Sequence, residues 1–212
     1  MNFNWVKTNS LIKKVFNNLV WDIPNSDKKI FLTFDDGPIP EITEWVLDIL
    51  KSEEIKATFF CIGDNIKKHP EVYKRILAEG HQTGNHTFNH LNGWKTETNH
   101  YIDNFKLCET ECLKLNSEHS FLFRPPYGKI KPSQTKAIRN LGYKIIMWDV
   151  LSYDFDPNII PEKCLENVIS NTEQGSIIVF HDSKKAEKNL KYALPKAIQI
   201  LKNKGFVFDV IS

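Results

Sequence analysis

Short runs of apolar, β-branched and aromatic residues alternate along the chain with longer stretches that carry apolar residues at helical spacing. This alternation is typical of a parallel α/β sheet or barrel. Seven runs predict strands, and they are KIFLTF ending at Phe34, KATFFCI ending at Ile62, HQTGN ending at Asn85, SFLFR ending at Arg124, YKIIMWD ending at Asp149, SIIVFHD ending at Asp182 and FVFDV ending at Val210.

The stretches between these runs predict helices. The first follows Pro40, which suits the first turn of a helix, and places Ile42, Trp45, Val46 and Ile49 on one apolar stripe. Further helices are expected over residues 65–79, 98–115, 133–140, 162–172 and 187–204. Glycines, which favour helix ends and the turns that follow, punctuate these stretches at Gly80, Gly142, Gly175 and Gly205.

A length of 212 residues is in the range of one domain and is enough to bury a substantial core. No linker, repeat or low-complexity segment divides the chain. We therefore expect one α/β domain over residues 29–212, with residues 1–28 as an N-terminal extension that packs on the barrel or closes its base.

Composition and charge indicate a soluble globular protein, with 41% hydrophobic and 25% charged residues. The net charge of +2 gives no strong field for nucleic acid or an anionic membrane, so we expect neither as a partner. No run is long enough to span a membrane, and the N-terminus lacks the apolar core of a signal peptide, which slightly favours a cytoplasmic protein unless a leader has been removed. The four cysteines form no CxxC pair and are expected to be reduced, structural thiols. The oligomeric state stays open.

Polar side chains follow the predicted strands at the points where the strands end. Active sites of parallel α/β barrels are built at the carboxyl ends of the strands, so we expect these side chains to converge. They are Asp35 and Asp36, His86 and His90, Arg124, the segment from Asp149 to Asp154, and His181 with Asp182.

Two of these groups suggest a metal site. Asp35 and Asp36 in TFDDGP point in different directions after a buried strand, so one can bind metal while the other takes a proton. The same four residues DDGP are also ordinary turn chemistry, and alone they favour a solvated turn. His86 and His90 in HTFNH are four residues apart, which lets two imidazoles bind one metal ion from a single helical turn. A lone histidine is more often structural, but this pair beside an acid favours a metal site.

Two histidines and one carboxylate form a three-ligand set that leaves coordination positions open, as catalytic metal sites require. We expect a divalent metal ion here. Zinc fits the set best, and Co, Mn, Ni or Fe are alternatives. Thr87 stands where the HExxH motif of zinc proteases has its glutamate, so the general base must come from elsewhere in the chain. A second carboxylate beside the metal suits that role.

Two further residues have two interpretations each. Arg124 begins RPPYGK, whose prolines stiffen the backbone so that an N–H near Tyr127 can donate to an oxyanion, but a surface loop is an equally good interpretation. His181 ends the apolar run SIIVF, where a titratable group is expected to be partnered or functional, and Asp154 is the candidate that would keep it protonated. A core histidine bonded to the backbone is the commoner outcome.

Together these residues resemble the polysaccharide deacetylase family, also called the NodB-homology or carbohydrate esterase family 4 domain. Five motifs occur in the family's order between Lys29 and Ser212, and this order makes the resemblance specific. The motifs are TFDDG at Thr33 to Gly37, HTxxH at His86 to His90, RPPYG at Arg124 to Gly128, WDxxSxD at Trp148 to Asp154 and VFH at Val179 to His181.

The resemblance implies a distorted, seven-stranded (β/α) barrel. It also implies a metal-dependent hydrolase that removes acetyl groups from the N-acetylglucosamine units of a chitin-like or peptidoglycan-like glycan. An N-acetylated glycan is therefore the expected partner. The metal ligands that the resemblance implies are Asp36, His86 and His90.

Catalytic roles follow from the same resemblance. It implies that Asp35 is the general base and that Arg124 positions it. The backbone N–H of Tyr127 is the implied oxyanion donor. His181 is the implied general acid, with Asp154 as its partner.

Two residues depart from the family's pattern. Phe155 stands where a tryptophan is usual, and Leu151 stands where an aspartate is frequent. Because an apolar Phe155 can still pack beside His181 and contact substrate, we expect altered substrate fit more than lost chemistry. Trp94 and Tyr153 are candidates for stacking on sugar rings, although buried packing is the more ordinary fate of such residues.

The same chemistry leaves two alternative functions open. The site could hydrolyse another amide or an O-acetyl ester such as acetylated xylan, because the fold does not determine the substrate. The chain could also be a carbohydrate-binding relative that has lost catalysis. The intact Asp35, Arg124 and His181 argue against that second alternative.

Overall fold

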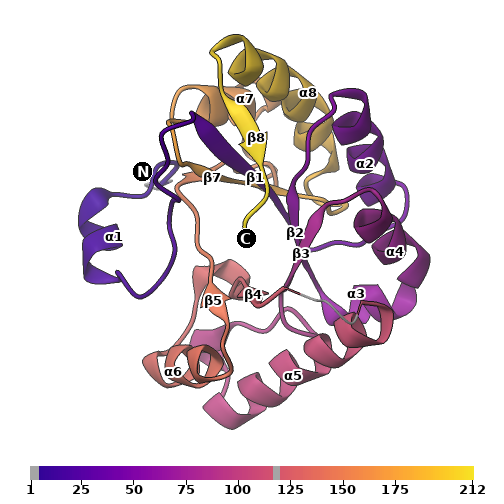
Figure 1. Cartoon of the computed structure of the whole chain (residues 1–212), viewed down its shortest axis with the longest axis vertical. Helices are drawn as coiled ribbons and strands as arrows, with labels where there is room; N and C mark the ends of the chain where they lie inside the picture. Colours follow the sequence, from indigo (N-terminus) through magenta and orange to yellow (C-terminus); the bar gives the residue numbers. More distant parts are fainter. Residues whose placement is uncertain (1–4, 117–119) are drawn as a thin grey trace.

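The computed structural model of the protein describes residues 5–116 and 120–212. Figure 1 shows a curled sheet surrounded by helices. The strands are β1 (Lys29–Asp35), β2 (Thr58–Cys61), β3 (Gln82–Asn85), β4 (Leu122–Phe123), β5 (Lys144–Ile145), β6 (Val150–Leu151), β7 (Ile177–His181) and β8 (Val207–Asp209). The helices are α1 (Ser10–Val15), α2 (Ile42–Ser52), α3 (Gly63–Lys68), α4 (Pro70–Ala78), α5 (Thr98–Leu115), α6 (Pro132–Asn140), α7 (Pro161–Ile169) and α8 (Glu187–Asn203), with 3₁₀ turns η1 (Gly93–Lys95) and η2 (Pro126–Gly128).

All strand pairs in the sheet are parallel, and the order is β5-β4-β3-β2-β1-β7-β6, with β8 pairing separately to β1. The seven strands in this order curl into a partial barrel. This confirms the predicted α/β fold class. The parallel order also brings the carboxyl ends of strands that are far apart in sequence to one edge, because each crossover returns the chain to the same starting end.

Two predicted elements differ in the structure. The predicted helix over residues 65–79 breaks at His69, because Pro70 begins α4 and the residue before a proline is held out of the helical region. The fifth predicted strand pairs with β4 for only two residues. The chain then leaves that ladder and pairs with β7 as a separate strand, β6.

The N-terminal segment occupies the gap between the two edge strands. The Val20 N–H donates to the carbonyl of Ile145 at 2.9 Å, and the Met147 N–H donates to the carbonyl of Val20 at 2.7 Å. Further along, the Leu151 N–H donates to the carbonyl of Val6 at 2.9 Å. These bonds satisfy backbone groups that the interrupted ladder between β5 and β6 leaves without strand partners.

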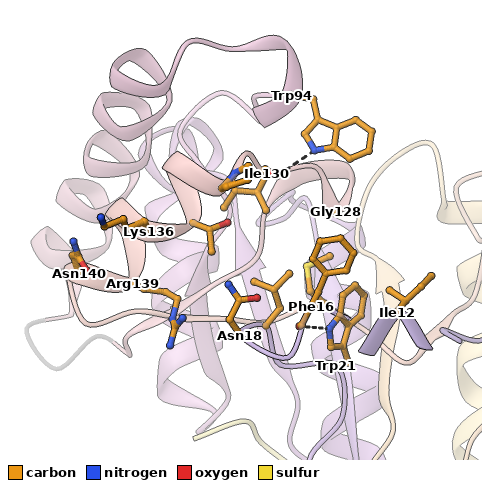
Figure 2. A pocket seen from close by; sticks show the side chains of 14 residues that line it. Ile12, Phe16, Asn18, Trp21, Trp94, Gly128, Ile130, Lys136, Arg139 and Asn140 are labelled. Atoms are coloured by element: carbon orange, nitrogen blue, oxygen red, sulfur yellow. Dashed lines mark hydrogen bonds between the residues drawn. The ribbon is translucent and has the colours of Figure 1, made fainter. Parts of the chain in front are cut away.

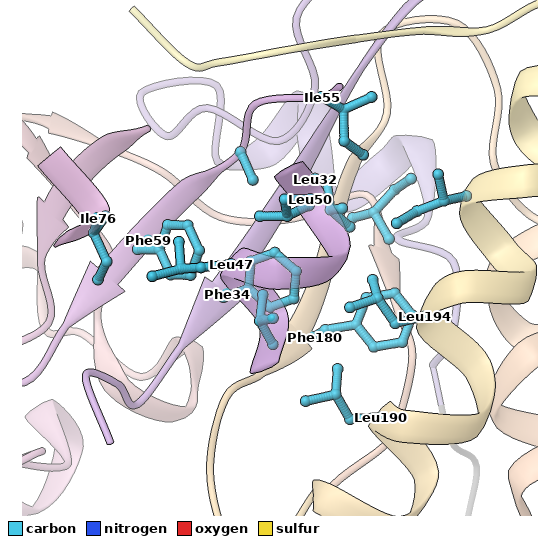
Figure 3. Packing of buried hydrophobic residues seen from close by; sticks show 14 of the residues in the cluster. Leu32, Phe34, Leu47, Leu50, Ile55, Phe59, Ile76, Phe180, Leu190 and Leu194 are labelled. Carbon is cyan, nitrogen blue, oxygen red and sulfur yellow. The ribbon is translucent and has the colours of Figure 1, made fainter. Parts of the chain in front are cut away.

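Side chains of β1 alternate between two environments, as strand geometry requires. Leu32 and Phe34 face the helices, where Phe34 stacks on Phe59 with ring centroids 5.0 Å apart (Figure 3). Phe31 faces the barrel interior with residues of the opposite strands. Thr33 shares the interior face with Phe31, so the strand directs polar groups inward near its carboxyl end.

Within the described residues, no helix is both long and apolar enough to cross a membrane. The four cysteines are buried thiols, and the structure contains no disulfide between them: Cys61, Cys108, Cys112 and Cys164. Free thiols in such surroundings behave as small apolar residues.

Asp149 does not belong to the polar groups at the carboxyl ends of the strands, and the expectation that placed it there was wrong. It precedes β6, and its N–H pairs with Ile177 at the start of β7. Its buried carboxylate binds the ammonium groups of Lys7 at 2.5 Å and Lys13 at 2.6 Å and accepts from the Ser176 hydroxyl. Asp149 therefore anchors the N-terminal segment at the opposite end of the barrel.

Replacing Asp149 with Asn should lower the free energy of unfolding by about 3 kcal/mol, because Lys7 and Lys13 each lose the buried one of their two carboxylate partners and keep only the more exposed Glu173 and Asp22. Urea unfolding measures this change. Asp48→Asn is the matched control, since Asp48 is 66% exposed in its pair with Arg75 and the loss there should stay below about 1 kcal/mol. Equal, small losses in both variants would show that Asp149 does not anchor the segment.

Candidate metal and catalytic site

Seven of the predicted polar residues converge at the carboxyl ends of the strands. They come from β1 and the loop after it, from the loops after β3, β4 and β6, and from the end of β7. In that order they are Asp35, Asp36, His86, His90, Arg124, Asp154 and His181. Within the sheet, Asp35 is directly opposite His181 in the β1–β7 ladder, which brings the first and last motifs of the chain side by side.

Asp36, His86 and His90 form a compact group of potential metal ligands. One ligand atom from each lies within 4.8 Å of the others. Oδ1 of Asp36 is 3.2 Å from Nε2 of His90 and 3.7 Å from Nε2 of His86. This Oδ1 is buried and has no hydrogen-bond partner among the described residues. Because a buried carboxylate oxygen is rarely left without a partner, the geometry fits a bound cation.

Contacts to Nδ1 orient the imidazole rings of both histidines. Nδ1 of His86 is 2.7 Å from the carbonyl oxygen of Arg124. Since a carbonyl oxygen only accepts, Nδ1 carries the proton, and the lone pair of Nε2 is free to bind a metal ion. Nδ1 of His90 is 3.1 Å from the Tyr127 hydroxyl. Such outer contacts fix the orientation and tautomer of metal-binding histidines.

The charge states of the group also suit a cation. Burial lowers the pKa of His86 to about 4, so the imidazole is neutral at pH 7. Burial alone would raise the pKa of Asp36, but the His90 ring at 3.2 Å and the charges of His181 and His86 hold it well below its ordinary value. A neutral imidazole and an ionised carboxylate are the forms that bind metal.

Residues 86–90 do not form the helical turn expected from the histidine spacing. Thr87 has φ 63° and His90 has φ 55°, so the backbone enters the left-handed region twice in five residues. Side-chain amides hold this shape: Oδ1 of Asn85 accepts from the Thr87 N–H at 2.8 Å, and Oδ1 of Asn104 on α5 accepts from the N–H groups of residues 88 and 89. Sequence reasoning missed Asn104 because it lies in another element.

Arg124 is a buried cation rather than a surface residue. Its guanidinium lies 4.1 Å from the centroid of the Phe60 ring inside the barrel. It donates to Oδ1 of Asp35 at 2.7 Å and to the Thr33 hydroxyl at 2.8 Å, and it also donates to the Met147 carbonyl at 2.9 Å. The carboxylate of Asp35 is therefore charge-balanced and held in one orientation.

His181 and Asp154 form a second tightly bonded pair. Oδ1 of Asp154 is 2.8 Å from Nδ1 of His181, and Oδ2 accepts the His181 backbone N–H at 2.7 Å. Burial lowers the pKa of His181, but the charge and hydrogen bond of Asp154 outweigh burial and raise it to about 9. The ring of Phe155 meets the imidazole edge-on, with centroids 4.8 Å apart, and forms a wall beside it.

Tyr127 lies in the strained RPPYG loop. Its φ is 60°, and the residue is 59% exposed. Gly128 follows with φ 65°, at a point where a Cβ would lie 2.6 Å from the Trp148 ring, so a larger residue would displace the loop. The Tyr127 hydroxyl contact with His90 was not expected, because only the backbone N–H of this residue was considered from the sequence.

Asp182 is a second residue that sequence reasoning left without a role. Its Oδ1 accepts from the Gly37 N–H at 3.0 Å, and its Oδ2 accepts from the Thr43 hydroxyl at 2.5 Å. A Cβ on Gly37 would lie only 1.9 Å from Oδ2. Asp182 thus holds the turn that carries the two adjacent aspartates, and burial raises its own pKa to about 8.

Comparison with known proteins gives consistent matches. Residues 22–146 match the family described as polysaccharide deacetylase. A peptidoglycan-N-acetylglucosamine deacetylase of Bacillus cereus is 34% identical over 198 residues, covering 92% of this chain and 91% of that protein. A chitooligosaccharide deacetylase of Azorhizobium caulinodans is 32% identical, covering 76% of each.

A solved structure is similar along almost the whole chain. It is a crystal structure of a peptidoglycan N-acetylglucosamine deacetylase in complex with a naphthalenyl N-hydroxybenzamide. The TM-score is 0.88 at 33% sequence identity, and the likeness covers 96% of this chain and 95% of the other.

In the metal-free protein, His181 should titrate near pH 9, and in Asp154→Asn its pKa should fall to or below the ordinary value of 6.5. The raised pKa means that the pairing stabilises the fold fully below about pH 6.5 and that this stabilisation is lost as pH rises through about 9. NMR titration of the imidazoles measures both proteins. His81, whose pKa burial lowers to about 4, is the internal control. An unchanged His181 pKa in the variant would contradict the pairing.

Proposed function

The chain belongs to the polysaccharide deacetylase family, and we propose that it hydrolyses the acetamide of N-acetylglucosamine units in a glycan, releasing acetate and a free amine. One observation carries the proposal: a group of three potential metal ligands lies at the same strand ends as a carboxylate held by an arginine and an imidazole held by a carboxylate. The names of the relatives, which refer to peptidoglycan and chitooligosaccharide, support an N-acetylated glycan as substrate.

In this proposal Asp36, His86 and His90 hold a divalent cation, and zinc is the first choice. Zinc accepts two imidazoles and one carboxylate in catalytic sites with an open position, although Co, Mn, Ni and Fe bind similar sets. When bound, the cation lowers the pKa of a water molecule and polarises a carbonyl oxygen.

Asp35 is the proposed general base, which takes the proton from the attacking water. Its position beside the ligand group supports this role, because Asp36 follows it directly in the chain and His181 faces it across the ladder. The guanidinium of Arg124 fixes the carboxylate and balances its charge, so that Asp35 is presented in one orientation. Arg124 acts through Asp35 and is a positioning residue.

His181 is the proposed general acid, which gives a proton to the leaving amine. The Asp154 carboxylate is hydrogen-bonded to Nδ1, so Nε2 is the nitrogen that donates the proton to the amine. A pKa near 9 keeps the ring protonated at pH 7, as an acid in this step must be. The Phe155 ring beside it shields the proton transfer from water and gives the substrate an apolar surface.

Tyr127 completes the proposed site. Its backbone N–H is the proposed donor to the oxyanion of the tetrahedral intermediate, and the stiff, left-handed loop would hold that donor in place before the reaction begins. Its exposed ring is available to contact the sugar.

Asp35→Asn should lower kcat for acetate release from an N-acetylglucosamine tetramer about 10²- to 10⁴-fold, the usual contribution of a general base. The bound metal content, measured by elemental analysis, should stay the same because the three ligands are untouched. Asp48→Asn, on the exposed surface, is the control and should keep full activity. Full activity of Asp35→Asn would contradict its assignment as base.

Acetate release from acetylated xylan, measured beside the tetramer, separates amide from ester hydrolysis. The proposal predicts a higher kcat/KM for the tetramer. A higher value for the xylan would replace the N-deacetylase proposal with an O-acetyl esterase.

A further inference from the structure

Five consecutive residues outside the five motifs together contact both loops that carry the potential metal ligands. They are residues 61–65, the end of β2 and the start of α3, and we call them the bridging segment. One loop is the aspartate turn, residues 35–37, and the other is the histidine loop, residues 86–90. The aspartate turn lies at the end of β1, the histidine loop follows β3, and β2 pairs in parallel with both of these strands. The segment that follows β2 therefore lies between the two loops.

Two bonds connect the bridging segment to the aspartate turn. The Asn65 side-chain amide donates to the carbonyl of Asp36 at 2.7 Å, and the Ile62 N–H donates to the carbonyl of Gly37 at 2.9 Å. Asp36 has φ 84°, a left-handed conformation that costs a residue with a side chain free energy and persists only when its surroundings hold it. The Asn65 bond is made to this strained residue, which is also a potential metal ligand.

Three bonds connect the bridging segment to the histidine loop. The His86 N–H donates to the carbonyl of Cys61 at 3.0 Å. The N–H groups of Gly63 and Asp64 donate to the carbonyls of residues 87 and 88, each at 3.0 Å. Residue 87 is the first of the two left-handed residues in this loop. The bonds therefore hold a potential metal ligand and the strained residue that follows it.

Gly63 is the point of closest packing in the bridging segment. A Cβ at this position would lie 2.8 Å from Cα of Cys108 on α5 and 2.8 Å from the Phe88 ring. The backbone of a packed helix cannot give way to a single side chain. The absence of a side chain at Gly63 thus lets the segment reach the histidine loop.

We propose that the bridging segment sets the distance between Asp36 and the two histidines, and that Asn65 is a positioning residue for Asp36. The inference rests on the proposed metal site. Oδ1 of Asp36 is 3.2 Å and 3.7 Å from the Nε2 atoms of His90 and His86. These separations are close to the roughly 3.3 Å between two ligands of one tetrahedral zinc ion. Ligands held in this arrangement before the ion arrives lose little conformational entropy on binding, so the segment raises the metal affinity.

The test measures the zinc Kd of the whole protein by competition with a chromophoric chelator. Asn65→Ala and Asn65→Leu, which keeps the size but has no donor, should raise this Kd about 10- to 100-fold, the usual effect of losing a partner of a metal ligand. The absorption spectrum of the cobalt-loaded protein should also change in both variants, because it reports the coordination geometry.

Asn25→Ala is the matched control. Asn25 is also partly buried, and its amide donates to the carbonyls of Ile23 at 3.0 Å and Lys29 at 3.1 Å, at the opposite end of β1. Asn140→Ala is a second control, because this exposed asparagine lines a cavity of about 530 Å³ between the N-terminal segment and α6 that none of the three ligands lines (Figure 2). Both controls should keep the zinc Kd and the cobalt spectrum of the wild type.

An unchanged zinc Kd in both Asn65 variants would overturn the inference, as would an equal rise in Asn25→Ala. A wild-type protein that binds no zinc would contradict the proposed metal site instead. A crystal structure of metal-free Asn65→Leu then decides the inference independently. Asp36 displaced from the two histidines supports it, and Asp36 in its original position overturns it. Urea unfolding of each variant establishes that it is folded.

Discussion

The site depends on one buried arginine. The Arg124 side chain lies inside the barrel and fixes the carboxylate of Asp35, while its backbone carbonyl fixes the ring of His86. A single residue thus sets the distance between the proposed base and the ligand group. A buried charge is tolerated only with complete pairing, and Arg124 meets this condition through Asp35, Thr33 and the carbonyls of residues 146 and 147.

The segment that includes residues 146 and 147 contacts both the N-terminal segment and the site. The segment that supplies two carbonyls to Arg124 is held from outside by the backbone of Val20, and the following Asp149 is held by Lys7 and Lys13. The N-terminal segment therefore supports the site from the gap between the edge strands. The loops at the carboxyl ends of β1, β3, β4 and β6 are strained. Within the described ranges, five of eight non-glycine residues with positive φ lie in these site loops, at Asp36, Thr87, His90, Tyr127 and Tyr153.

Strand β1 and the helix over residues 98–115 could be predicted from the sequence, because the spacing of apolar residues within each segment determines them. The convergence of Asp35 with His181 could also be predicted, because parallel topology places strand ends together. The loop shape at His90 could not, since it depends on Asn104 from a distant helix. The roles of Asp149 and Asp182 could not be predicted for the same reason: each acts through partners that are far away in sequence.

The most direct test of this account is anomalous diffraction from crystals grown with zinc. The account predicts one strong peak about 2.0–2.2 Å from Oδ1 of Asp36 and Nε2 of His86 and His90, with an open position facing Asp35. The central claim is that Arg124 arranges the base and the metal ligands as one unit, since its carbonyl orients His86. A peak at another place, or a zinc ion at this site that His86 does not bind, would contradict it.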